Sequence, residues 1–193
     1  MIGNRPLLIG IDGLGGSGKT TYALNLLGQL KNAIVIHLDD FVHTREVRYN
    51  DQFEEWYCYY HVQWRYDYLI EKLLKPLKSG LAVRDAIELY DKPTDSYRMR
   101  IFDIPVGATV IVEGIFLQRP ELRGYFDKVI YLETNQETRM ARALDRDSYI
   151  GGSEDIIRHY EQRYFPAEDI YVEQCNPLEM ADAVEYEVRG RAL

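Results

Sequence analysis

A glycine-rich segment at residues 13–20, Gly-Leu-Gly-Gly-Ser-Gly-Lys-Thr, constrains the fold more than any other part of the chain. It fits the pattern Gly-x-x-x-x-Gly-Lys-[Ser/Thr], whose backbone N–H groups surround the phosphates of a nucleoside triphosphate. The apolar run at residues 7–12 predicts a buried strand before it, and the amphipathic run at residues 21–30 predicts a helix after it. Strand, glycine loop and helix are the structural context that the pattern requires.

The residues of this loop have separate expected roles. Its glycines let backbone N–H groups turn toward the β-phosphate, and the positive end of the helix dipole adds to the attraction. Lys19 is expected to reach the β- and γ-phosphate oxygens, and Thr20 to offer its hydroxyl to Mg²⁺. The expected ATP-binding residues are Gly13, Gly15, Gly16, Ser17, Gly18, Lys19, Thr20 and Thr21.

The same glycines fit a second pattern. Gly13, Gly15 and Gly18 also match Gly-x-Gly-x-x-Gly, the dinucleotide-binding pattern, and an acidic residue, Asp39, follows about twenty residues later. Lys19 decides between the two, because a cation at a helix N-terminus opposes the helix dipole unless a polyanion lies there. We therefore interpret the segment as a triphosphate loop, with a glycine turn that binds nothing as the remaining alternative.

The composition limits the other classes of protein. The chain has 193 residues, 46% of them hydrophobic, without a long apolar run, so we expect a single domain over residues 1–193 and no membrane partner. The net charge of −8 argues against general binding to nucleic acid. Cys58 and Cys175 are isolated, which favours reduced thiols in a cytoplasmic protein. The sequence does not determine the oligomeric state, and a homo-oligomer is one of the alternatives.

Apolar runs alternate with helical patterns along the chain. This alternation predicts an α/β fold with a mostly parallel sheet and helices on both faces. Together with the triphosphate loop at residues 13–20, the pattern resembles the three-layer sandwich of P-loop NTPases. The helical stripe at 62–77 is expected to close at Pro76 and Ser79-Gly80. The expected strands are residues 7–12, 33–38, 109–113, 128–133 and 183–188, and the expected helices are residues 21–30, 62–77, 136–146 and 154–164.

Two segments interrupt this alternation. Residues 81–105 contain two short extended runs, which we expect to form a hairpin or side sheet beside the site of a second substrate, the acceptor of a transferred group. Residues 146–166 contain Gly151 and Gly152 and then a further helix, which is typical of a small lid with glycine hinges.

Carboxylates follow two of the expected strands. Asp39 and Asp40 come after the second strand, and Glu113 ends the third. Because ligands of such a sheet bind outside the carboxyl ends of its strands, we expect these side chains to meet the phosphate loop in one crevice. There Thr20, Asp39 and Glu113 would hold Mg²⁺, and one carboxylate would accept the proton of an attacking hydroxyl. For each residue alone, the alternative is an acidic side chain that only solvates a surface loop.

Arg139, Arg142 and Arg146 recur at positions i, i+3 and i+7, so they share one face of the helix expected at 136–146. Neighbouring acidic residues make an ordinary salt-bridged surface the alternative. We interpret Arg139 and Arg142, together with Lys19, as catalytic cations that neutralise charge on the transferred phosphoryl group.

These motifs together resemble those of the uridine kinase / phosphoribulokinase family of P-loop kinases. The resemblance implies that Asp39 is the catalytic base and part of the Mg²⁺ shell, that Glu113 is the second carboxylate, and that Tyr90 borders the acceptor. We expect Asp40 and Arg146 to border the acceptor as well. The matching segments are residues 13–21, Asp39-Asp40-Phe41, Tyr90-Asp91, Glu113-Gly114-Ile115 and Thr138-Arg139…Arg142…Arg146-Asp147.

We therefore expect an ATP-dependent kinase that phosphorylates the hydroxyl of a small metabolite, with a uridine-like nucleoside as the leading candidate. Three departures from the family put the nucleoside in question. Asp40 stands where relatives often carry a small polar residue, Asp95 lies near the position of a base-contacting histidine, and the lid segment around Gly151-Gly152 is short. The alternatives are kinases of other small alcohols, similar to phosphoribulokinase, pantothenate kinase or nicotinamide riboside kinase. A nucleotide-dependent switch is a third class of protein. Against it, the sequence has no Asn-Lys-x-Asp guanine signature, and the nearest segment is Asn135-Gln136-Glu137-Thr138.

Overall fold

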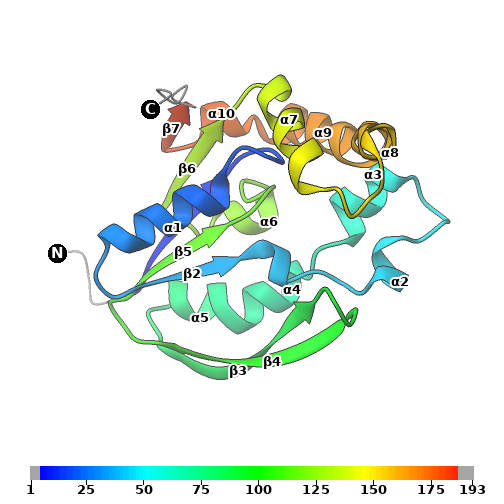
Figure 1. The fold of residues 1–193 in the computed structure, drawn as a ribbon. Helices are drawn as coiled ribbons and strands as arrows, with labels where there is room; N and C mark the ends of the chain where they lie inside the picture. The colour runs from blue at the N-terminus through cyan, green and yellow to red at the C-terminus, as the bar shows by residue number, and fades with distance from the viewer. Residues whose placement is uncertain (1–4, 187–193) are drawn as a thin grey trace.

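The computed structural model describes residues 5–186, which form a central sheet of five strands (Figure 1). These strands are β1 (Leu7–Asp12), β2 (Ala33–His37), β5 (Thr109–Glu113), β6 (Lys128–Glu133) and β7 (Ala183–Tyr186). Their order is β2-β5-β1-β6-β7, and each neighbouring pair is parallel. The expected strands are confirmed; residues 187 and 188, assigned to the last one, lie outside the described residues.

Both faces of the sheet are buried. Successive side chains of a strand point to opposite faces, so Leu8 of β1 packs in one apolar cluster and Ile9 and Ile11 pack in another. Helix α1 (Lys19–Gln29) covers the face of Ile9 and Ile11, mainly through the fully buried Ala23. The helices with buried residues in the opposite cluster are α4 (Tyr66–Leu69), α5 (Lys75–Lys78), α6 (Pro120–Arg123) and α9 (Phe165–Cys175).

Strands β3 (Val83–Asp91) and β4 (Ser96–Ile104) form a separate antiparallel hairpin. The hairpin lies beside the central sheet and not within it, below α4 and α5 in the view of Figure 1. Its inner side chains, which include Ile87 and Phe102, join the cluster that packs on the sheet. The side segment expected at residues 81–105 is therefore this hairpin.

One expected helix end is confirmed and another is wrong. The helix expected to close at Pro76 and Ser79-Gly80 ends at Lys78 with Ser79 as its C-cap, whereas the helix expected to end at Tyr164 continues through α9 to Cys175. In both places one π-helical turn ends two residues before a proline, Pro76 or Pro166. The wider turn changes the hydrogen-bonding register, which accommodates a residue without an N–H group.

The start of the helix expected at 62–77 also differs. Val62 ends a π-helical turn that extends α3 (Glu55–Tyr57), and a new helix begins with α4 at Tyr66. Between them, Val42 and Trp64 form an isolated β-bridge. The chain therefore turns at residues that the hydrophobic periodicity alone assigned to one helix.

The remaining helices are α2 (Arg45–Arg48), α7 (Gln136–Arg146), α8 (Ser153–His159) and α10 (Pro177–Met180). Helix α7 has the expected bounds, and its N-cap is Asn135, whose side chain accepts a hydrogen bond from the N–H of Thr138 at 2.8 Å. The segment nearest to a guanine signature is therefore a helix cap. Within the described residues, no helix is long and apolar enough to cross a membrane.

The buried face of the helix that contains Leu73 predicts a large stability effect. Leu73 is fully buried, so Leu73→Ala should lower the free energy of unfolding by about 2–5 kcal/mol, measured by urea denaturation. Ile101 on the outer face of the hairpin is 82% exposed, and Ile101→Ala should change that free energy by less than about 0.5 kcal/mol. Equal losses for the two variants would contradict this assignment of the core.

Candidate active site

Two arginines of α7 fix the backbone of the glycine loop between β1 and α1. Arg139 Nη1 donates to the carbonyl oxygen of Gly15 at 3.1 Å, and Arg142 Nη1 donates to that of Gly16 at 2.9 Å. The orientation of two successive loop carbonyls is therefore set by charged donors. Gly16 has a φ of +79°, and a Cβ there would lie 2.9 Å from the carbonyl oxygen of Arg139, so this position requires glycine.

Glu168 of α9 holds the same part of the loop. Its Oε1 accepts from the N–H of Gly15 at 2.8 Å, and its Oε2 accepts from Arg139 Nη1 at 2.8 Å. Glu168 is only 2% exposed and Arg139 only 6%. Burial raises the pKa of the Glu168 carboxyl, and Arg139 opposes that rise. One buried ion pair thus binds both the N–H and the C=O of Gly15.

The loop ends at the N-terminus of α1, which suits an anion. Gly18 is the N-cap, with a φ of +93°, and the first turn of α1 contains no acidic residue. The partial positive charge of the helix end is therefore not neutralised from within the helix. Lys19 begins α1, and its Nζ donates to the carbonyl oxygen of Leu14 at 2.9 Å.

The two central strands bring carboxylates to the same place. In the parallel register of β2 and β5, His37 lies opposite Glu113. Glu113 Oε1 accepts from Thr20 Oγ1 at 3.1 Å and lies 2.6 Å from His37 Nδ1. The hydrogen bond to Glu113 raises the pKa of His37. His37 had no role in the sequence interpretation, because the register of the two strands is what brings it to Glu113.

Asp39 lies in a short 3₁₀ turn, Leu38–Asp40, directly after β2. Desolvation by the crevice walls and repulsion by the Glu113 carboxylate raise the pKa of Asp39, whereas the charges of Lys19 and Arg146 lower it. Desolvation lowers the pKa of Lys19, and the charges of Glu113, Asp12 and Asp39 raise it. Carboxylates and a lysine whose pKa values are shifted by burial and by one another are typical of functional sites.

Three adjoining cavities form one crevice at this edge of the sheet. We call them the donor cavity, of about 490 Å³, the middle cavity, of about 480 Å³, and the acceptor cavity, of about 650 Å³. Asp39 lines all three. The donor cavity is otherwise lined by Gly15, Gly16, Gly18, Lys19, Thr20, Thr21, Tyr59, Glu113, Gly114, Ile115, Arg142 and Arg146.

The expected site residues divide into two groups. Most of the phosphate loop lines the donor cavity, as do Arg142 and Arg146, and Asp40 and Tyr90 line the acceptor cavity. Gly13, Ser17 and Arg139 line none of the three cavities. Arg139 instead contacts the loop from behind, through Gly15 and Glu168.

The donor cavity suits Mg²⁺ held together with phosphates. The Thr20 hydroxyl and the carboxylates of Glu113 and Asp39 are the hard oxygen donors that Mg²⁺ prefers. Over residues 5–186, no three His, Cys, Asp or Glu side chains converge as a complete metal site. Mg²⁺ in phosphate-binding sites is usually held by one or two carboxylates together with substrate phosphates and water.

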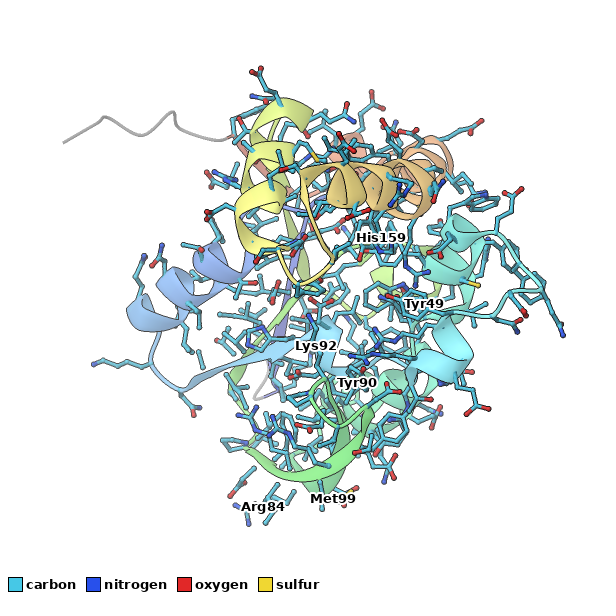
Figure 2. The ribbon with its side chains drawn as sticks, turned by 45° about the vertical axis from the view of Figure 1, so that its right-hand side comes forward. Tyr49, Arg84, Tyr90, Lys92, Met99 and His159 are labelled. Atoms are coloured by element: carbon cyan, nitrogen blue, oxygen red, sulfur yellow. The ribbon has the colours of Figure 1, made fainter. Side chains whose placement is uncertain are left out.

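The acceptor cavity lies between the tip of the hairpin and helix α8. Tyr90, Lys92, Tyr49 and His159 surround it in Figure 2. The Tyr90 hydroxyl accepts from Arg48 Nη2 at 2.6 Å and donates to Asp95 Oδ1 at 2.9 Å. Of the aromatic residues at 49–68, Tyr49 lines this cavity and the mostly buried Tyr59 lines the other two, whereas Tyr60 and Trp64 are buried in the core.

The chain is similar to known kinases over most of its length. The model of the Phosphoribulokinase / Uridine kinase family matches residues 8–189. The chain is 30% identical, over 172 residues, to a uridine kinase from Staphylococcus aureus, and the match covers 86% of this chain and 81% of that one. A solved structure from Bacillus stearothermophilus, described as a possible uridine kinase, superposes with a TM-score of 0.77 at 32% identity. That superposition covers 95% of this chain and 90% of the other.

The buried contact of Glu168 with the loop predicts a defect in triphosphate binding. Removal of the carboxylate in Glu168→Ala leaves Arg139 and the N–H of Gly15 without their partner, so the Kd for ATP should rise about tenfold or more. Calorimetric titration with ATP measures this change. Glu173→Ala, an exposed carboxylate on the same helix, is the control. Unchanged ATP affinity in a folded Glu168→Ala protein would contradict the role given to this contact.

The position of Lys19 predicts a selective loss of phosphate binding. Lys19→Ala should weaken the binding of ATP far more than that of adenosine, because only ATP carries phosphates for the amine to contact. Parallel titrations with ATP and adenosine measure the two affinities. Losses of equal size would count against a phosphate cradle at residues 13–20.

Proposed function

The chain belongs to the phosphoribulokinase / uridine kinase family of ATP-dependent kinases, and from this premise we propose that it transfers the γ-phosphoryl group of ATP to a hydroxyl of a small metabolite. One observation carries the proposal: Asp39 lines the donor cavity beside the phosphate loop and also the acceptor cavity on its other side. A base at that junction is placed to act on a hydroxyl that faces bound phosphates.

We assign the catalytic steps to residues of this crevice. The carboxylate of Asp39 accepts the hydroxyl proton while the acceptor oxygen bonds to the γ-phosphorus and the bond to the ADP oxygen breaks. Lys19, Arg142 and Arg146 stabilise negative charge on the phosphates. Mg²⁺, when held by Thr20, Glu113 and Asp39, would neutralise further charge on the phosphate oxygens. Arg139, which does not line the crevice, supports the loop from behind.

The named relatives make uridine the first acceptor to test. The same relatives support a small-molecule acceptor in general. We also propose that residues 1–193 act as one kinase domain, with the segment at 146–166 closing over the crevice from Gly151 and Gly152. A cytoplasmic location, the absence of nucleic-acid and membrane partners, and a homo-oligomer stay predictions.

The role of Asp39 predicts a loss of turnover without a loss of nucleotide binding. Asp39→Asn keeps the size of the side chain and removes the base, so kcat should fall by about 10²–10⁴-fold while ATP binding stays largely intact. A coupled assay of ADP release, together with calorimetric titration of ATP, measures both quantities. Asp169→Asn is the control, at an exposed carboxylate of α9 that lines none of the three cavities. Retention of most activity by Asp39→Asn would remove Asp39 as the base.

A further inference from the structure

Basic side chains line the acceptor cavity. They are Arg45, Arg48 and Lys92, of which Lys92 also lines the middle cavity. Arg45 and Arg48 line neither the donor cavity nor the middle cavity, and no residue of the phosphate loop lines the acceptor cavity. These two arginines therefore lie at the end of the crevice that is remote from the transferred phosphoryl group.

These cations have no carboxylate partner in the described part of the chain. Most basic side chains there form an ion pair, as Arg84 does with Asp103 and Lys72 does with Asp85. No such pair forms at Arg45, Arg48 or Lys92. Because the protein as a whole carries a net charge of −8, unpaired cations around one cavity run against its overall composition.

The carboxylates on this cavity wall also have other partners. Asp95 accepts from the backbone N–H of Arg45 at 2.9 Å and from the hydroxyl of Tyr90 at 2.9 Å, and the charges of Arg45 and Arg48 add to these bonds in lowering its pKa. Asp40 lines the cavity too, but its charge is faced by His37, Arg100 and Arg98. Asp39 lies at the junction with the donor cavity.

Arg48 is held in an orientation that suits an oxyanion. Its guanidinium carbon lies 4.6 Å from the ring centre of Tyr90 and 5.6 Å from that of Tyr49, and its Nη2 donates to the Tyr90 hydroxyl. Its Nε is buried and has no hydrogen-bond partner among the described residues. A guanidinium stacked on rings keeps its in-plane donors for a carboxylate or phosphate. Lys92 Nζ lies 3.8 Å from the ring centre of Tyr149 on the same cavity.

We infer that the acceptor is a small alcohol with an anionic group, a carboxylate or a phosphomonoester, at the end away from the hydroxyl that is phosphorylated. The inference rests on the proposed function for the position of the hydroxyl, at Asp39, and on Arg45, Arg48 and Lys92 for the anion. A neutral nucleoside leaves these three cations without an ion pair, their charge offset only by the more distant carboxylates of Asp95 and Asp147, whereas an anion forms charge-assisted hydrogen bonds with them.

Matched pairs of neutral and anionic alcohols test this inference. The pairs are pantothenol and pantothenate, glycerol and glycerate, glycerol and glycerol 3-phosphate, and ribose and ribose 5-phosphate, with uridine as the nucleoside. We expect the best acceptor to be an anion whose kcat/KM exceeds that of its neutral partner at least tenfold. The carboxylate and phosphate pairs distinguish the two forms of the anion.

Substitution of the cations tests the site itself. Arg48→Gln should raise the KM for the anionic acceptor at least tenfold and leave the KM for ATP unchanged. Arg45→Gln, at an exposed side chain that carries little risk to folding, should also raise the acceptor KM. Arg84→Gln is the control, because Arg84 lies away from the cavity on the hairpin and forms an ion pair with Asp103 (Figure 2).

The outcomes separate this inference from the proposed function. Turnover of uridine with a kcat/KM above that of every anion, or an acceptor KM that neither arginine variant changes, would overturn the inference and leave the kinase intact. If no alcohol is phosphorylated, calorimetric titration with the same anions decides: binding that is lost in Arg48→Gln would support the anion site while the proposed function fails. Absence of anion binding would overturn the site as well.

Discussion

The buried ion pair between Arg139 and Glu168 is the interaction on which the geometry of the site depends. It binds both backbone groups of Gly15 and so connects the glycine loop to α7 and α9, which lie far apart from it in sequence. Removal of one member of such a pair leaves a buried charge, which costs about 3–5 kcal/mol. The loop therefore does not acquire its shape from its glycines alone. The glycines allow the required backbone angles, and the ion pair selects one arrangement among them.

The parallel sheet supplies the second requirement. Because the strands run in one direction, the residues that follow β1, β2 and β5 meet at one edge, and the register of β2 with β5 places His37 against Glu113. The turn after β2 packs closely on the end of β5, where a Cβ on Gly114 would lie 2.4 Å from the Cβ of Leu38. A glycine after Glu113 thus lets the turn that carries Asp39 approach the second carboxylate.

Much of this arrangement is predictable from the sequence, because strand periodicity and the phosphate-loop pattern depend on neighbouring residues. The five strands, α7 and the position of Asp39 after β2 belong to this class. The continuation of the helix past Tyr164 and Pro166 was not predictable, since hydrophobic periodicity does not reveal a π-helical turn. Glu168 and Arg48 were missed because their roles come from contacts across the fold, with Gly15 and Tyr90, and no local pattern marks them.

The central claim is that the nucleotide held by the glycine loop reacts with a small alcohol in the adjoining cavity. ADP formation from ATP and Mg²⁺, followed with and without the panel of small alcohols, tests it most directly. The account predicts that ADP formation depends on one added alcohol and produces one phosphorylated product for each ADP. ADP formation that no alcohol changes, but that a protein partner accelerates, would contradict the account and favour a nucleotide-dependent switch.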